Sequence, residues 1–172
     1  MNRLVEALAY IGALESLVFI VGIIYAVALW ANGALPALLR LGNGLAKRKI
    51  ALFAKGDNVS SLKNLLMDSK LFKAKNICEI SKKEDIGRAE SATMFLVFWP
   101  DWTSDLPEIL TRKSDGCPLI VYAPYDKGTI PDVEMKNLDS KRHTAVTNFR
   151  GRLLNDIVTF MMSTSYERKK VQ

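Results

Sequence analysis

The segment Thr93–Trp99, TMFLVFW, gives the clearest indication of the fold of this 172-residue chain. It is the most apolar strand candidate, its polar and apolar residues do not alternate, and Pro100 ends it. Such continuous runs are typical of strands in a parallel sheet, because helices cover both faces of the sheet. The segment therefore predicts a central strand of an α/β domain.

Strand and helix signals alternate on both sides of this segment. Short apolar runs predict further strands at residues 50–54, 76–80, 119–123 and 145–149. Helices are predicted from an apolar stripe of Val59, Leu62, Leu65 and Leu66, at 81–90, at 106–110, and from a C-terminal stripe of Leu153, Leu154, Ile157, Val158 and Met161, with a looser stretch at 124–142. Repeated strand–helix units predict a parallel sheet with right-handed crossovers.

Units of this length predict a flavodoxin-like or receiver-like sheet, with strand order 2-1-3-4-5 and a ligand site beyond the carboxyl ends of the strands. The residues that follow the predicted strands are Lys55, Gly56, Asp57, Asn58, Pro100, Asp101, Trp102, Tyr125, Asp126, Asn148, Arg150 and Arg152. Of these, we predict that the ligand-binding residues are Gly56, Asp57, Asn58, Asp101, Trp102, Arg150 and Arg152.

Two segments of this edge each have two interpretations. Residues 55–58 form either a turn with a helix N-cap or a small anion-binding nest at a helix start. Arg150 and Arg152 flank Gly151. In one interpretation, their guanidinium groups and the nearby backbone N–H groups converge on a phosphate. In the alternative interpretation these arginines are solvated or paired with carboxylates such as Asp156. The sequence leaves both questions open.

Near the amino terminus, Ala9–Ala31 (AYIGALESLVFIVGIIYAVALWA) is a nearly unbroken apolar run with one charged residue, Glu15. A helix rises about 1.5 Å per residue, so this run matches the ~30 Å hydrocarbon core of a bilayer. It is longer than the apolar region of a secretory signal peptide. We predict a transmembrane helix, with a buried helix of a soluble core as the alternative.

Basic residues set the expected orientation, because Lys and Arg stay on the cytoplasmic side. Arg40 and Lys47–Lys49 follow the apolar run, whereas Arg3 alone precedes it. We expect residues 1–46 to form a single-pass helix and an interfacial segment, and residues 47–172 to form a cytoplasmic domain at a bacterial inner membrane. Within the first part, 33–46 is either an interfacial helix or the second half of a short hairpin.

The apolar run carries its own assembly signals. Glu15 is costly in lipid, so it is expected to face another helix or water. Gly22 and Ala26 have the small-xxx-small spacing that lets helices approach closely. These residues predict a homo-oligomer, and the alternative is a monomeric helix whose Glu15 side chain reaches the interface.

Composition excludes several classes of protein. The formal net charge of +6 is spread along the chain, which favours a solvated face near anionic lipid over nucleic-acid binding. Cys78 and Cys117 have no partner at metal-ligand or redox spacing. The chain lacks the GxGxxG, Walker and GxSxG motifs. We therefore expect neither a metal nor a cofactor.

The segments KIALFAKGD, TMFLVFWPDW, DLPEIL and LIVYAP, in this order, resemble TIR, TIR-like and receiver domains. The TIR resemblance implies that Glu108 is an NAD-cleaving glutamate, although Pro107 precedes it. The receiver resemblance implies that Asp101 is a phosphoacceptor and Asp57 one of an acidic pair, but Arg150 stands where receivers carry a lysine. The likeness is one of fold, which does not by itself define an activity.

A membrane helix joined to such a domain resembles the two-part membrane effectors of bacterial antiphage defence. The resemblance implies a cytosolic domain that senses a nucleotide-type or other anionic signal, and oligomerised helices that perturb the membrane. The alternatives are a membrane-tethered enzyme that cleaves NAD through Glu108 and a non-catalytic docking protein. Expected partners are membrane lipid, further copies of the chain and a nucleotide second messenger.

Overall fold

The computed structural model describes residues 2–167 and divides into two compact units at Leu39. Residues 1 and 168–172, which belong to the two predicted domains, lie outside the described part. The division falls before the predicted domain boundary at 46/47, inside the helix α2 (Ala34–Lys47). Leu45 of this helix packs on the α/β core. The exact limit of the membrane-associated part therefore stays a prediction.

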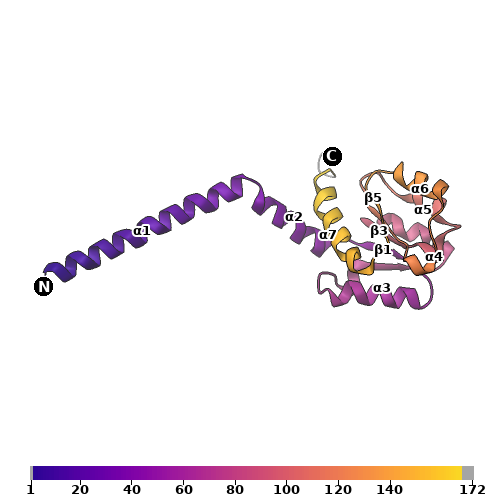
Figure 1. Ribbon diagram of the computed structural model, residues 1–172, viewed down its shortest axis with the longest axis horizontal. Helices are drawn as coiled ribbons and strands as arrows, with labels where there is room; N and C mark the ends of the chain where they lie inside the picture. Colours follow the sequence, from indigo (N-terminus) through magenta and orange to yellow (C-terminus); the bar gives the residue numbers. More distant parts are fainter. Residues whose placement is uncertain (1, 168–172) are drawn as a thin grey trace. The chain divides into compact units, whose positions relative to one another are not determined.

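The amino-terminal unit begins with α1 (Asn2–Ala31), whose segment Ala9–Ala31 has a mean hydropathy of 2.2 and no buried residues (Figure 1). Its length and composition suit a membrane span, a property that anchors share with signal sequences. Gly33 follows with a φ of 90°, a conformation that side chains with a Cβ rarely adopt. This turn separates α1 from α2.

The second unit contains a five-stranded parallel sheet in the order β2-β1-β3-β4-β5, which is a flavodoxin-like topology and confirms the prediction. The strands are β1 (Ile50–Phe53), β2 (Ile77–Ile80), β3 (Met94–Phe98), β4 (Leu119–Tyr122) and β5 (Thr144–Thr147). Phe53 pairs with Val97, and Val97 pairs with Val121. The carboxyl ends of the three central strands therefore meet at one edge.

The central strand is the apolar segment from which the fold was predicted. β3 lies between β1 and β4, and all of its residues are buried. Its side chains alternate between two apolar cores, Phe95 and Val97 on one face and Met94, Leu96 and Phe98 on the other. Because helices cover both faces, neither set alternates with polar residues.

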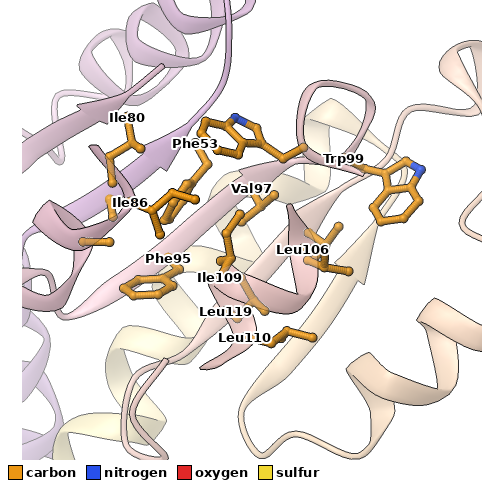
Figure 2. Packing of buried hydrophobic residues seen from close by; sticks show 14 of the residues in the cluster. Phe53, Ile80, Ile86, Phe95, Val97, Trp99, Leu106, Ile109, Leu110 and Leu119 are labelled. Carbon is orange, nitrogen blue, oxygen red and sulfur yellow. The ribbon is translucent and has the colours of Figure 1, made fainter. Parts of the chain in front are cut away.

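Helices cover the sheet on both sides (Figure 1). One face is covered by α3 (Asp57–Asp68) and α7 (Arg150–Glu167), and the other by the 3₁₀ helix η2 (Lys83–Ser91), α5 (Leu106–Arg112) and α6 (Asp132–Asp139). The shorter elements are η1 (Ala74–Asn76), α4 (Trp99–Trp102) and η3 (Tyr125–Lys127). Figure 2 shows Leu106, Ile109 and Leu110 of α5 against the strand residues Phe95, Val97 and Leu119.

Helix α6 lies in the stretch that we predicted to be irregular. Only Leu138 of this helix is buried, so the sequence lacks the apolar stripe that marks the other helices. Residues 83–91 form a 3₁₀ helix whose buried residues are Ile86 and Ala89. Both elements pack on the sheet through few side chains, which explains their weak sequence signals.

Candidate functional site

At the carboxyl ends of β1 and β3, a carboxylate of the chain itself binds the polar groups that follow β1. Asp101, on α4, accepts a hydrogen bond from the Lys55 backbone N–H at 2.7 Å. The side-chain amide of Asn58 donates to both Asp101 oxygens, at 3.2 and 3.1 Å. Hydrogen bonds to an ionised acceptor are about twice as strong as neutral ones. The groups expected to form an anion nest therefore bind Asp101.

Gly56 contributes its backbone conformation to this corner. It precedes α3 as the N-cap, with φ 54° and ψ −134° and no side-chain capping bond. A residue with a Cβ is strained in this region, at a cost of about 1–3 kcal/mol. Gly56 thus allows the turn that brings Lys55 and Asn58 to Asp101.

Trp102 is part of the apolar core. Its side chain is fully buried, and its ring lies edge-on to Phe53 with centroids 5.5 Å apart. The Lys55 ammonium lies 4.5 Å from the centroid of its ring. The indole Nε1–H has no hydrogen-bond partner within the described residues. Trp102 therefore packs in the apolar core at this edge of the sheet and presents no surface to a ligand.

A cleft of about 150 Å³ opens at the same edge, on the face covered by α3 and α7. Its walls come from the start of α3, the ends of β3 and β4, the segment after β4, and the start of α7. The lining residues are Asn58, Ser61, Leu62, Phe98, Tyr122, Pro124, Asp126, Lys127 and Arg150. Asn58 thus belongs both to the Asp101 cluster and to the cleft.

Arg150 is held in place by α3. Its Nη1 donates to the Ser61 Oγ at 2.9 Å, and its Nη2 donates to the Ser61 backbone carbonyl at 2.9 Å. The guanidinium group has five N–H donors, so these bonds leave others for a ligand. Arg150 is also the first residue of α7, where the positive end of the helix dipole favours an anion.

Aromatic rings and further charges complete the cleft. Phe98 and Tyr122 are the last residues of neighbouring strands, and their ring centroids lie 5.7 Å apart. The Lys127 ammonium lies 5.6 Å from the Phe98 ring. Burial raises the pKa of the Tyr122 phenol, the positive charge of Arg150 lowers it, and Asp126 raises it. The pKa of the phenol therefore depends on two of the charged side chains that line the cleft, Arg150 and Asp126.

Outside the corner formed by Asp101 and its neighbours, three further predicted site residues do not line the cleft. Asp57 and Arg152 are exposed and do not line it. Glu108 lies on α5, a helix of the opposite face, and its Oε2 is 3.6 Å from the Lys83 ammonium. The same ammonium lies 2.9 Å from Asp105 Oδ1. The structure thus brings Asn58 and Arg150 together and leaves Glu108 apart from them.

Several residues that line the cleft were not predicted from the sequence. Phe98 and Tyr122 were assigned only to strands, and Ser61 only to a helix. A signal for the rings exists, because final residues of adjacent parallel strands share one edge. Whether such a ring faces a helix or a cleft depends on the packing above it, which periodicity does not report.

The described residues contain no group of three or more His, Cys, Asp or Glu side chains able to hold a metal ion. Comparison with known proteins gives no relative: no protein-family model, curated protein or solved structure matches the chain. The sheet topology establishes the flavodoxin-like fold, and no family is assigned. Function is therefore argued from the site, because this fold hosts many unrelated activities.

Proposed function

We propose that the chain is a membrane-anchored sensor whose α/β domain binds a small anionic ligand in the cleft beside Arg150. One observation carries the proposal: the guanidinium group lines the cleft while Ser61 holds it by two hydrogen bonds. A donor fixed in advance loses less entropy when it binds an anion. Lys127 adds a second positive charge against the single carboxylate of Asp126.

Helix α7 offers a route from the cleft to the membrane-associated part. It begins at Arg150, and Leu153, Ile157 and Met161 pack its length against the sheet. Near its other end, the buried Thr164 hydroxyl accepts a hydrogen bond from Arg48 Nη1 at 2.8 Å. Arg48 directly follows α2. A ligand that prefers one position of α7 thus also biases the residues that lead to the anchor.

The membrane part of the proposal rests on α1. We propose that it anchors the chain in a bacterial inner membrane, with the α/β domain in the cytoplasm, and that ligand-dependent assembly of the helices perturbs the bilayer in defence. The exposed apolar segment Ala9–Ala31 supports a span. Glu15 within that segment supports assembly, because an acidic side chain in lipid gains from a partner helix.

Ligand binding is the direct test. The full chain in detergent micelles is titrated calorimetrically with inorganic phosphate, the four nucleoside monophosphates and NAD. At least one anion is expected to bind, and Arg150→Ala is expected to weaken its binding at least tenfold. Arg152→Ala is the matched control, since this exposed arginine of the same helix does not line the cleft.

Three results would decide against this function. Failure of every anion to bind would contradict the anionic ligand. An equal loss of anion affinity in Arg150→Ala and Arg152→Ala would show that the cleft is not the binding site. Turnover of NAD that Glu108→Gln abolishes would establish the enzymatic alternative instead.

Assembly is tested in vesicles that contain the full chain. Glu15→Leu is expected to reduce cross-linked oligomers and dye release from the vesicles, because it removes the polar group that favours helix contact. Leu17→Ala is the control, since helical spacing of about 100° per residue places it on the other side of α1. Unchanged cross-linking in Glu15→Leu would show that the acid is merely tolerated.

A further inference from the structure

A larger groove lies along β2, the strand at one edge of the sheet. Its volume is about 560 Å³, and residues of β2 and of η2 line it. Four of the lining residues are basic and two are acidic, so the groove carries a net positive charge. The charged lining residues of this β2 groove are Lys49, Lys75, Glu79, Lys82, Asp85 and Arg88.

Both acidic side chains of the β2 groove already have a basic partner. Glu79 Oε1 lies 2.7 Å from the Lys63 ammonium, and Asp85 Oδ1 lies 3.5 Å from Arg88 Nη1. The three lysines of the groove are exposed, and none has a carboxylate partner within the part of the chain that the structure describes. The groove therefore presents an excess of positive charge to its surroundings.

The segment that leads from the apolar helix into the α/β domain is fixed at this groove. The buried Asn76 side-chain amide donates to the backbone carbonyls of Ala46 and Arg48, at 3.4 and 2.9 Å. The next residue, Lys49, lines the groove itself. Hydrogen bonds thus hold the entry of the chain to the domain at one end of the basic surface.

We infer that the β2 groove binds the phosphate groups of anionic lipid headgroups and so holds the α/β domain on the bilayer surface. This inference rests on the membrane anchor of the proposed function. Residues 32–48, most of which form α2, connect the apolar segment to the groove. Anchoring of that segment therefore keeps the groove at a high effective concentration of lipid.

The chemistry of the β2 groove suits lipid better than one defined soluble anion. Lysine carries a compact charge on a flexible stem, so it accepts phosphates in many arrangements. Each basic residue near an anionic membrane favours association about fivefold. In contrast, the guanidinium group of Arg150 is fixed by two hydrogen bonds to Ser61, which suits a single anion.

A native thiol reports whether the β2 groove is covered. Cys78 lines the groove and is partly exposed, whereas Cys117 is buried. The full chain is placed in nanodiscs of zwitterionic phosphatidylcholine, alone or mixed with anionic phosphatidylglycerol, and N-ethylmaleimide modification of each cysteine is followed by mass spectrometry. Anionic lipid is expected to slow modification of Cys78 at least tenfold, because bound headgroups cover it. Slow modification of Cys117 shows that the domain stays folded.

The lysines are tested by a pair of double variants. Lys75→Gln combined with Lys82→Gln is expected to lose most of the protection of Cys78, since each lysine contributes about fivefold. Lys136→Gln combined with Lys141→Gln is the matched control, because these exposed lysines lose the same charge and do not line the groove. Each variant is compared with itself in phosphatidylcholine, which removes any direct effect on the thiol.

The possible results separate this inference from the proposed anchor. Modification of Cys78 that does not depend on lipid charge, or equal protection in the two double variants, would overturn the inference while the anchor stands. Full protection in phosphatidylcholine by soluble glycerol 3-phosphate or by an acidic peptide would overturn it in favour of a soluble partner. A chain that does not co-purify with the nanodiscs would overturn the proposed anchor as well.

Discussion

Two parts of one sheet edge use their polar groups in opposite ways. At the carboxyl ends of β1 and β3, Asp101 accepts hydrogen bonds from the Lys55 N–H and the Asn58 amide within the protein. Beside the ends of β3 and β4, Arg150 is held by Ser61 yet also lines an open cleft. A charged residue at the carboxyl ends of the strands is therefore available to a ligand only where its hydrogen-bonding capacity is not already used by the protein.

The same comparison assigns different consequences to mutation. The groups around Asp101 stabilise the fold, so their loss is expected to lower the free energy of unfolding. The groups that line the Arg150 cleft are expected to affect ligand binding more than stability.

Trp102→Ala is expected to have the largest effect on stability. The ring is fully buried against Phe53, and removing an aromatic ring from a core costs about 3–5 kcal/mol. Trp102→Phe is expected to cost less, about 1–2 kcal/mol, because it keeps most of the packing and removes the unpaired Nε1–H. Urea unfolding followed by circular dichroism measures both. A stable Trp102→Ala variant that has lost ligand binding would instead make Trp102 a ligand contact.

Asp101→Ala is expected to lower the free energy of unfolding by about 2 kcal/mol, because the Lys55 N–H and the Asn58 amide lose their charged acceptor. Asp57→Ala is the matched control. Asp57 is exposed, and such substitutions stay within about 0.5 kcal/mol. If the two variants unfolded at the same urea concentration, the carboxylate of Asp101 would not be structural.

Ser61→Ala is expected to cost about 1 kcal/mol, the value of one lost hydrogen bond, since the bond from Arg150 to the Ser61 backbone carbonyl remains. It is also expected to weaken anion binding several-fold by loosening the guanidinium group. Ser60→Ala on the same helix is the control, because Ser60 is exposed and does not line the cleft. Unaltered anion affinity in Ser61→Ala would show that Arg150 does not need this support.

The smallest expected effect is electrostatic. Burial raises the folded pKa of Tyr122 above 10.0, so above that pH the unfolded chain binds fewer protons and stability falls as the pH rises. Arg150→Ala is expected to raise this pKa further, and Asp126→Asn to lower it. Absorbance titration with Tyr122→Phe as reference identifies the phenol. Identical titrations in the Arg150→Ala variant and the parent protein would place the guanidinium away from Tyr122.

Local patterns predicted most of the architecture. The unbroken apolar segment Thr93–Trp99 indicated a strand buried on both faces, and β3 is central with every residue buried. Helical stripes predicted α3 and α7, whose buried residues include Leu62 and Ile157. These inferences succeed because burial on one or both faces imposes a period on neighbouring residues. The apolar run Ala9–Ala31 likewise predicted a long apolar helix, which α1 contains.

The tertiary structure alone decided the composition of the site. Arg150 and Arg152 are equivalent in the sequence, yet only Arg150 lines the cleft. The sequence does not reveal that Asp101 accepts hydrogen bonds from Lys55 and Asn58, and its predicted role in ligand binding stays a prediction. These outcomes depend on contacts between segments far apart in the chain. A local period records which face of an element is buried, but it contains no information about which distant group meets each polar atom.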